Sequence, residues 1–166
     1  MSEWQNKAWG QTRCTIERPE YQEHELKVKA GGYCSVHYHE RRANSFEVLE
    51  GVIAVCVFRG WTWQRRFLSS GSERFVVPSQ VVHRFEVFLR GRVIEAYWPD
   101  RGDKEIRTDD IVRLDEGGRI LSNQPAKVGN VAFDAKHFDA VLRSRLPKSV
   151  QLYAPVKKFF ERICGP

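Results

Sequence analysis

The sequence predicts an all-β domain, folded as a small antiparallel barrel, with a short helical extension at its C-terminal end. Two observations support this fold class. Between Glu25 and Trp98, short segments rich in β-branched and aromatic residues recur, and glycine, proline or serine separates one segment from the next. Beyond Arg119, apolar residues recur at helical spacing instead. Many short strands separated by frequent turns are typical of β-sandwiches and barrels.

The expected strands follow one another at short intervals. They cover residues 25–29, 33–39, 45–49, 52–58, 64–68, 74–77, 83–88 and 93–98. Turns are expected at residues 30–32, Gly51, Gly60, 69–71, Pro78 and Gly91. The barrel with its N-terminal strand is therefore assigned to residues 1–119.

Residues 120–166 are expected to form a linker and a helical tail. Residues 134–146 carry a helical stripe, and a second helix is expected over 155–163, with Pro155 in its first turn. The apolar positions of the tail are Phe138, Val141, Leu142, Leu146, Val156, Phe159, Phe160 and Ile163. Such a set must be buried, so we expect the tail to serve assembly, as a homodimer or against a protein partner.

Composition indicates an ordinary water-soluble domain. The chain has 166 residues, of which 42% are hydrophobic and 29% charged, and this size suits one domain. It has no apolar run near the about 20 residues that span a bilayer, and its start lacks the apolar core of a signal peptide. The four cysteines are scattered, which predicts free thiols. A cytoplasmic protein without membrane contact is expected.

The chain is basic, with a formal net charge of +6. Its basic residues are distributed rather than gathered in one block, and none belongs to a base-reading motif, so nucleic acid is not the expected partner. The planar guanidinium group of arginine binds phosphate in a bidentate manner. Binding of a small anionic substrate is therefore the simpler explanation of the basic residues.

Three histidines stand in a pattern that favours a metal site. Side chains alternate along a strand, so His37 and His39 point the same way. His83, from a distant strand, supplies a third imidazole. Imidazole suits zinc, iron and similar divalent ions, and a site with an open position can do chemistry.

These residues resemble the two sequence motifs of the cupin superfamily. The first motif is matched by Gly31, His37, His39 and Gly51, and the second by Pro78 and His83. The departures are Asn44 in place of the usual glutamate ligand, Ser72 and Gln80 in place of glycines, and Val87 in place of an asparagine. The resemblance implies a cupin jelly-roll barrel holding a divalent metal ion (Zn, Mn or Fe), with His37, His39 and His83 as ligands and Asn44 as a weak fourth ligand.

Within the cupins, residues 9–119 are most similar to the isomerase domain of bifunctional mannose-6-phosphate isomerase/mannose-1-phosphate guanylyltransferases. The matching segments are Trp9-Gly10, residues 42–44, residues 81–84, residues 109–115 and Gly118-Arg119. This likeness implies a sugar phosphate as the substrate. Arg42 and Arg84 flank the metal-binding segments and are expected to hold it. Tyr33 shares the strand parity of the histidines and is expected to line the pocket and contact the substrate. The catalytic residue is not identified, because Asn44 has no useful basicity; Glu50, Glu86 and Glu95 are candidates.

Three function classes remain open. The first is a metal-dependent isomerase of a sugar or sugar phosphate, in which the ion acts as a Lewis acid and a side chain shuttles a proton. The second is a non-catalytic cupin that acts as a structural, assembly or ligand-binding module. The third is a three-histidine iron dioxygenase, for which the missing carboxylate ligand is no handicap. Isomerase chemistry is the leading hypothesis.

Overall fold

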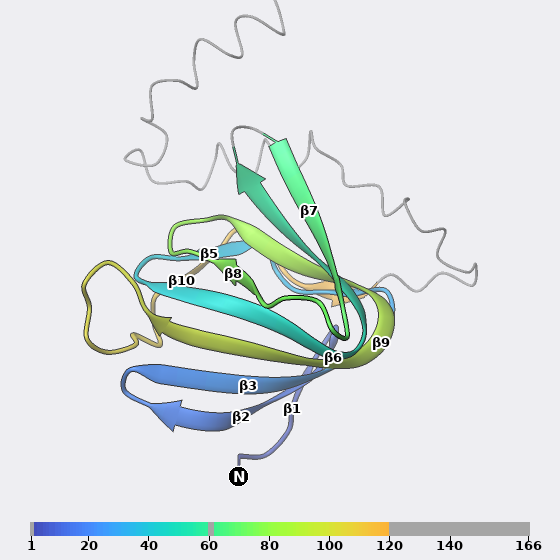
Figure 1. Cartoon of the computed structure of the whole chain (residues 1–166), viewed down its shortest axis with the longest axis horizontal. Helices are drawn as coiled ribbons and strands as arrows, with labels where there is room; N and C mark the ends of the chain where they lie inside the picture. Colours follow the sequence, from blue (N-terminus) through green and yellow to red (C-terminus); the bar gives the residue numbers. More distant parts are fainter. Residues whose placement is uncertain (1, 60–61, 120–166) are drawn as a thin grey trace, which may run out of the picture. The chain divides into compact units, whose positions relative to one another are not determined.

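A computed structural model describes residues 2–59 and 62–119, which form one antiparallel sheet of eleven strands that curls around an apolar interior (Figure 1). The strands are β1 (Gln5–Lys7), β2 (Gly10–Arg18), β3 (Tyr21–Val28), β4 (Gly32–Tyr33), β5 (His37–His39), β6 (Arg42–Arg59), β7 (Thr62–Ser69), β8 (Phe75–Val77), β9 (His83–Pro99), β10 (Ile111–Arg113) and β11 (Gly118–Arg119). The all-β prediction is confirmed.

Two long strands, β6 and β9, pair with each other along most of their lengths. The second half of β9 also pairs with β3, whereas its first half pairs with β4 and β5. In the same way, the first half of β6 pairs with β8 and its second half with β7. The two strands thereby belong to both parts of the sheet, so the sheet folds over and encloses the core (Figure 1).

The turns expected at Gly51 and Gly91 are wrong, because both residues lie inside continuous strands that bend there. Gly51 has φ +88°, a conformation that glycine adopts without a Cβ clash. A Cβ built on Gly91 would lie 1.8 Å from the carbonyl oxygen of Glu50. These glycines let the two backbones approach closely at the bend.

The bend also reverses which residues face the interior. Phe46 and Val48 are buried before it, whereas Ile53 and Val55 are buried after it. The β6–β9 register shifts between Val48 and Ile53, and such a β-bulge inserts a residue and changes the side-chain parity. One unbroken strand thus contributes to the core on both sides of the bend. The core cluster comprises Leu26, Val28, Cys34, Phe46, Val48, Ile53, Val55, Val57, Leu68, Val77, Phe85, Val87 and Val93.

An N-terminal strand was expected from the sequence, but no residue ranges were predicted for β1, β2, β10 and β11. β2 is largely polar and lies next to the sheet's outermost strand, so its residues are mostly half-buried or exposed and carry little hydrophobic alternation. The strand expected over residues 33–39 is two short strands, β4 and β5, with irregular chain between them. β11 ends at Arg119, and the predictions for the tail, residues 120–166, lie outside the described residues.

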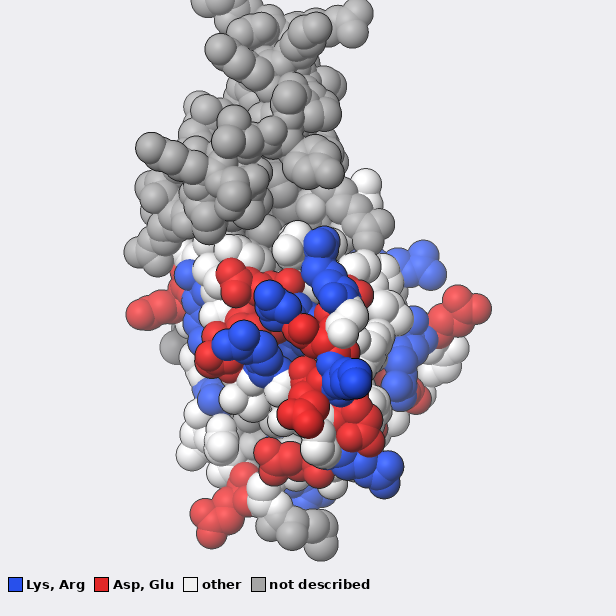
Figure 2. All heavy atoms as spheres, turned by 90° about the vertical axis from the view of Figure 1, so that its left-hand side faces the viewer, with Lys and Arg blue, Asp and Glu red and all other residues white. Residues whose placement is uncertain are grey.

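Charges are mixed on the molecular face drawn in Figure 2, where lysine and arginine side chains are interspersed with aspartate and glutamate. This agrees with the scattered basic residues of the sequence. Within residues 2–59 and 62–119, no helix is long and apolar enough to cross a membrane. Cys14, Cys34 and Cys56 are free thiols, as the scattered spacing predicted.

Candidate metal centre

His37, His39 and His83 converge inside the barrel. His37 and His39 lie on β5, and His37 is directly opposite His83 of β9. One potential ligand atom from each ring lies within 4.8 Å of the other two. The three residues are 6%, 2% and 1% exposed, respectively. The expectation that these histidines meet is confirmed, and the cluster could hold a metal ion.

Hydrogen bonds orient two of the rings so that their Nε2 atoms carry the lone pairs that could bind an ion. His37 Nδ1 donates to the carbonyl oxygen of Ser35 over 2.7 Å, and His83 Nδ1 donates to that of Val81 over 2.8 Å. The Nε2 atom of His39 is buried and has no hydrogen-bond partner. An unpartnered buried nitrogen is costly unless something else binds it. This donor set, neutral nitrogen atoms facing one another, fits a divalent metal ion.

Burial also keeps the three imidazoles neutral. It lowers the pKa of His83 to about 3 and the pKa of His37 well below its ordinary value, and the neighbouring histidines lower both further. Burial likewise lowers the pKa of His39, although Asp110 opposes this. Metal ligation requires the unprotonated ring, so the site is prepared for an ion at neutral pH.

Asp110 supports the cluster from the side. Its Oδ1 atom lies 3.3 Å from His39 Nδ1 and 2.9 Å from Arg42 Nε, while its Oδ2 accepts from the main-chain N–H groups of Arg41 and Arg42 over 3.2 and 3.0 Å. β10 follows Asp110 directly and pairs with β5 along His37–His39. The sequence marked residues 109–115 only through a family resemblance; the structure shows that the segment holds the His-x-His strand.

Asn44 lies beside the cluster and is fully buried. Its Nδ2 atom lies 3.2 Å from His83 Nε2 and donates to Glu95 Oε1 over 2.9 Å, whereas its Oδ1 atom has no partner. An ion bound to His83 Nε2 would compete with this N–H group for the same lone pair. Ligation of a metal by Asn44 itself stays a prediction.

The three glutamates named as candidate bases have different surroundings. Glu95 faces the interior, where it contacts Asn44 and Tyr97. Burial raises the pKa of its carboxyl group, and hydrogen bonds from those two side chains partly offset the rise. Glu86 forms ion pairs with Arg84 and Arg65. Glu50 is exposed. Glu95 is therefore the carboxyl group that the fold brings close to the histidines.

The residues expected to hold a substrate are divided between two faces. Arg42 is buried at the start of β6, where its guanidinium pairs with Asp110 and lies 4.5 Å from the Tyr97 ring centre. Arg84 follows His83 and so points to the opposite face, where its guanidinium lies 5.5 Å from the Tyr33 ring centre. The fold brings Arg42 to the histidines, but not Arg84 or Tyr33.

Two further residues lie near the interior. Cys34 lies in the core, where its sulfur accepts a hydrogen bond from the Phe85 N–H over 3.1 Å. The chain between β4 and β5 is irregular, so strand alternation does not apply there. His24 is half-buried, and its ring packs against Tyr97.

Comparisons with known proteins bear mainly on the fold. No family model matches the sequence, and no curated protein matches it. Among solved structures, KdgF from Halomonas sp. is similar, with TM-score 0.51 and 26% identity, over 61% of this chain and 89% of KdgF. An RmlC-like cupin from Shewanella frigidimarina has TM-score 0.51 and 23% identity, over 61% of this chain and 87% of that one.

Oxalate decarboxylase from Bacillus subtilis is also similar, with TM-score 0.57 and 14% identity. The similarity covers 68% of this chain but 30% of the decarboxylase. At such identities the likeness concerns the fold alone. Together, the curled sheet, the bend in its two long strands and these structural similarities show that the chain has the cupin fold, with a buried three-histidine cluster inside it.

Proposed function

We propose that this protein is a metal-dependent isomerase that moves a proton between neighbouring carbon atoms of a small hydroxylated carbonyl compound. His37, His39 and His83 would hold the ion, which would act as a Lewis acid and polarise a carbonyl oxygen. The mannose-6-phosphate type of reaction, suggested by residues 9–119, is one specific case. The observation that carries the proposal is the buried Glu95 carboxyl group next to the cluster.

Glu95 is proposed as the acid–base group. As a carboxylate it takes the proton from the hydroxyl-bearing carbon next to the carbonyl group, which leaves an enediolate. The hydroxyl proton passes to the former carbonyl oxygen, and Glu95 returns the first proton to the former carbonyl carbon, so the hydroxyl and carbonyl groups exchange places. Burial raises the pKa of Glu95, and a general base works best when its pKa lies near the working pH. No other reactant is needed, because isomerisation conserves atoms and electrons.

The neighbours of Glu95 hold it in place. Tyr97 hydrogen-bonds to the carboxyl group, and burial raises the pKa of Tyr97 well above its ordinary value, so its hydroxyl group stays a donor. Asn44 donates to Glu95 Oε1 and contacts His83, which fixes the carboxyl group relative to the cluster. Arg42 covers one face of the Tyr97 ring.

The test is proton exchange with solvent. Full-length protein would be loaded in turn with Zn, Mn and Fe(II), and incorporation of deuterium from D2O into aldoses, ketoses and their phosphates would be followed by NMR. Glu95→Gln should lower exchange at least about 100-fold, since general acid–base groups contribute about 10²–10⁴. Glu50→Gln makes the same change at an exposed site and should retain full exchange. Equal rates in the two variants would refute the proposed role of Glu95.

A second candidate is a three-histidine iron dioxygenase. The observation that favours it is the absence of a carboxylate from the metal-ligand cluster found within residues 2–59 and 62–119. Oxygen uptake by the Fe(II)-loaded protein in the presence of small thiols, unaffected by Glu95→Gln, would support this candidate. If the metal-loaded protein gave neither proton exchange nor oxygen uptake, a non-catalytic module would be favoured.

A further inference from the structure

Two polar side chains of β3 face the interior beside Glu95. In an antiparallel sheet, directly opposed residues share a face. Gln22 is opposite Tyr97, which is opposite Asn44; in the next row, His24 is opposite Glu95. Leu26 and Val28 continue the same face of β3 into the apolar core. One end of the interior is therefore lined by polar groups from three adjacent strands.

Several hydrogen-bonding atoms at this end are unused. Gln22 is 9% exposed, yet no group among the described residues hydrogen-bonds to its side-chain amide. His24 is half-buried, and no hydrogen bond to its ring nitrogens is found among the described residues, whereas Asn44 Oδ1 is fully buried without a partner. Buried polar groups in folded proteins are normally hydrogen-bonded. The rule applies to Asn44 Oδ1, and the amide of Gln22 and the ring of His24 offer further hydrogen-bonding atoms on the same face, so we infer that a ligand uses these three groups.

The charges at this end favour an uncharged ligand. Arg42 acts electrostatically on His24, but its guanidinium pairs with the Asp110 carboxylate. Glu95 lies opposite His24 and disfavours a second anion when it is ionised. Burial, followed by the effect of Arg42, lowers the pKa of His24, so its ring is a neutral donor and acceptor. Hydroxyl groups, which donate and accept, suit all three residues.

We propose that Gln22, His24 and the Oδ1 atom of Asn44 form a subsite for the hydroxyl groups of a neutral sugar or other polyol. The Gln22 amide donates and accepts, and Asn44 Oδ1 accepts a hydroxyl hydrogen. This inference rests on the proposed function, since the hydroxylated compound bound here is the one whose carbon lies against Glu95. It assigns specificity to hydroxyl groups rather than to a phosphate.

Binding to the metal-free, full-length protein tests the subsite without turnover. D-fructose, D-mannose and their 6-phosphates would be titrated by NMR against the wild type, Gln22→Leu and Gln5→Leu, which makes the same change at an exposed position of β1. We expect the neutral sugars to bind and Gln22→Leu to weaken them about three- to tenfold, as loss of uncharged hydrogen bonds does. Gln5→Leu should bind as the wild type does, and the phosphates should bind no more tightly.

Three results would overturn the subsite: no binding of either neutral sugar, equal affinities for the two glutamine variants, or tighter binding of the phosphates. If Gln22→Leu fails to fold, the side-chain amide signals of Gln22 in the wild type decide, since they must shift when sugar is added. Binding that depends on Gln22 without proton exchange would refute the isomerase and leave the subsite standing. Proton exchange that Gln22→Leu leaves unchanged would refute the subsite and leave the isomerase standing.

Discussion

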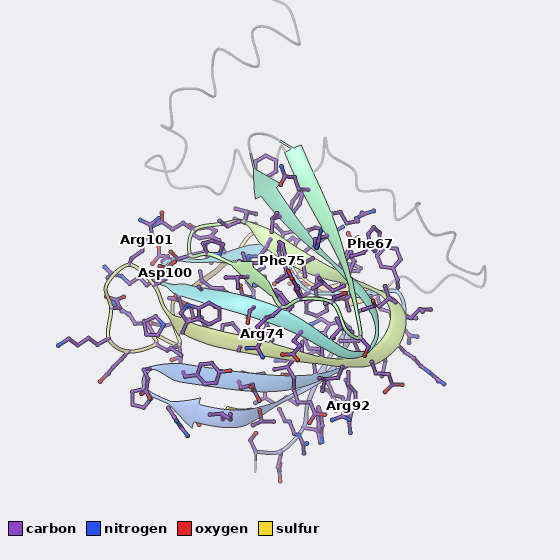
Figure 3. All side chains as sticks on the ribbon, viewed as in Figure 1. Phe67, Arg74, Phe75, Arg92, Asp100 and Arg101 are labelled. Carbon is purple, nitrogen blue, oxygen red and sulfur yellow. The ribbon has the colours of Figure 1, made fainter. Side chains whose placement is uncertain are left out.

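The main-chain N–H group of Gln80 donates a hydrogen bond to the carbonyl oxygen of His39 over 2.6 Å. This contact ties the turn before His83 to the strand that carries the other two histidines. Ser79 N–H donates to the Asp100 carboxylate over 3.0 Å, and Arg101 Nε donates to Ser79 Oγ over 3.0 Å. Figure 3 shows Asp100 and Arg101 together at the end of β9. The third histidine thus reaches the cluster through an anchored turn.

Replacing Gln80 by glycine should stabilise the protein by about 0.5–1 kcal/mol. Gln80 has φ +61°, a left-handed conformation that is costly for a residue with a Cβ. Its position is one where the cupin motif has glycine. Urea denaturation would measure the change, with Gln80→Ala as control, since alanine shortens the side chain but keeps the Cβ. If alanine stabilised the protein as much as glycine did, backbone strain would not be the cause.

Replacing Asp110 by asparagine should weaken metal binding about 10- to 100-fold, the usual effect of removing a carboxylate that supports a ligand histidine. The carboxylate lies 3.3 Å from His39 Nδ1, pairs with Arg42 and accepts from the main chain. Titration calorimetry with zinc would measure the affinity. Asp109→Asn is the matched control, because the Asp109 side chain is 74% exposed. Equal affinities in the two variants would show that Asp110 has no influence on the ion.

Replacing Gly91 by alanine should destabilise the protein by at least about 3 kcal/mol, because a Cβ there would overlap the main chain at Glu50. Backbone atoms at the bend cannot move aside as a flexible side chain can. Gly102→Ala is the control, since a Cβ on Gly102 meets no atom within 4 Å although its φ is positive. Thermal unfolding of both variants would measure the difference, and similar melting temperatures would contradict the close approach of β6 and β9.

The metal-free protein should lose stability as the pH falls below about 6.5. The folded pKa of His83 is about 3, so between these values the unfolded chain binds a proton that the folded protein does not. The free energy of unfolding should then fall by up to about 1.4 kcal/mol per pH unit for this histidine. Denaturation of the wild type and His83→Gln from pH 7 to 5 would isolate this contribution.

Glu95 has the opposite effect on the pH dependence of stability, because its raised pKa lets the folded protein bind a proton more readily than the unfolded chain does. It is present in both proteins, so it cancels when the two pH profiles are subtracted. Parallel profiles would show that His83 is not held neutral by burial.

Restoring the usual glutamate at position 44 should tighten metal binding and destabilise the metal-free protein. The new carboxylate would lie next to Glu95, where two buried negative charges repel each other unless an ion neutralises them. The double variant Asn44→Glu/Glu95→Gln keeps the number of carboxyl groups and should recover the lost stability. Thermal unfolding with and without zinc would measure both effects. Unchanged metal affinity in Asn44→Glu would place residue 44 away from the ion.

The sequence by itself determined the strand-rich fold and the three histidines. Alternation along a strand predicts that His37 and His39 face the same way, and the motif spacing identifies His83 as their partner. These are local or family-wide patterns, and the structure confirms that the three rings meet. The division at residue 119, the helical tail, the homodimer and the cytoplasmic location stay predictions.

Only the tertiary structure decided which other side chains lie beside the cluster. Glu95 and Asp110 are far from His37 and His39 along the chain, and sheet pairing brings them there. Gly51 and Gly91 look like turns in the sequence, because a local pattern cannot distinguish a turn from a bend that the partner strand holds in place. Which side chains face the interior after that bend depends on the β6–β9 register, and this register is set by contacts between distant residues.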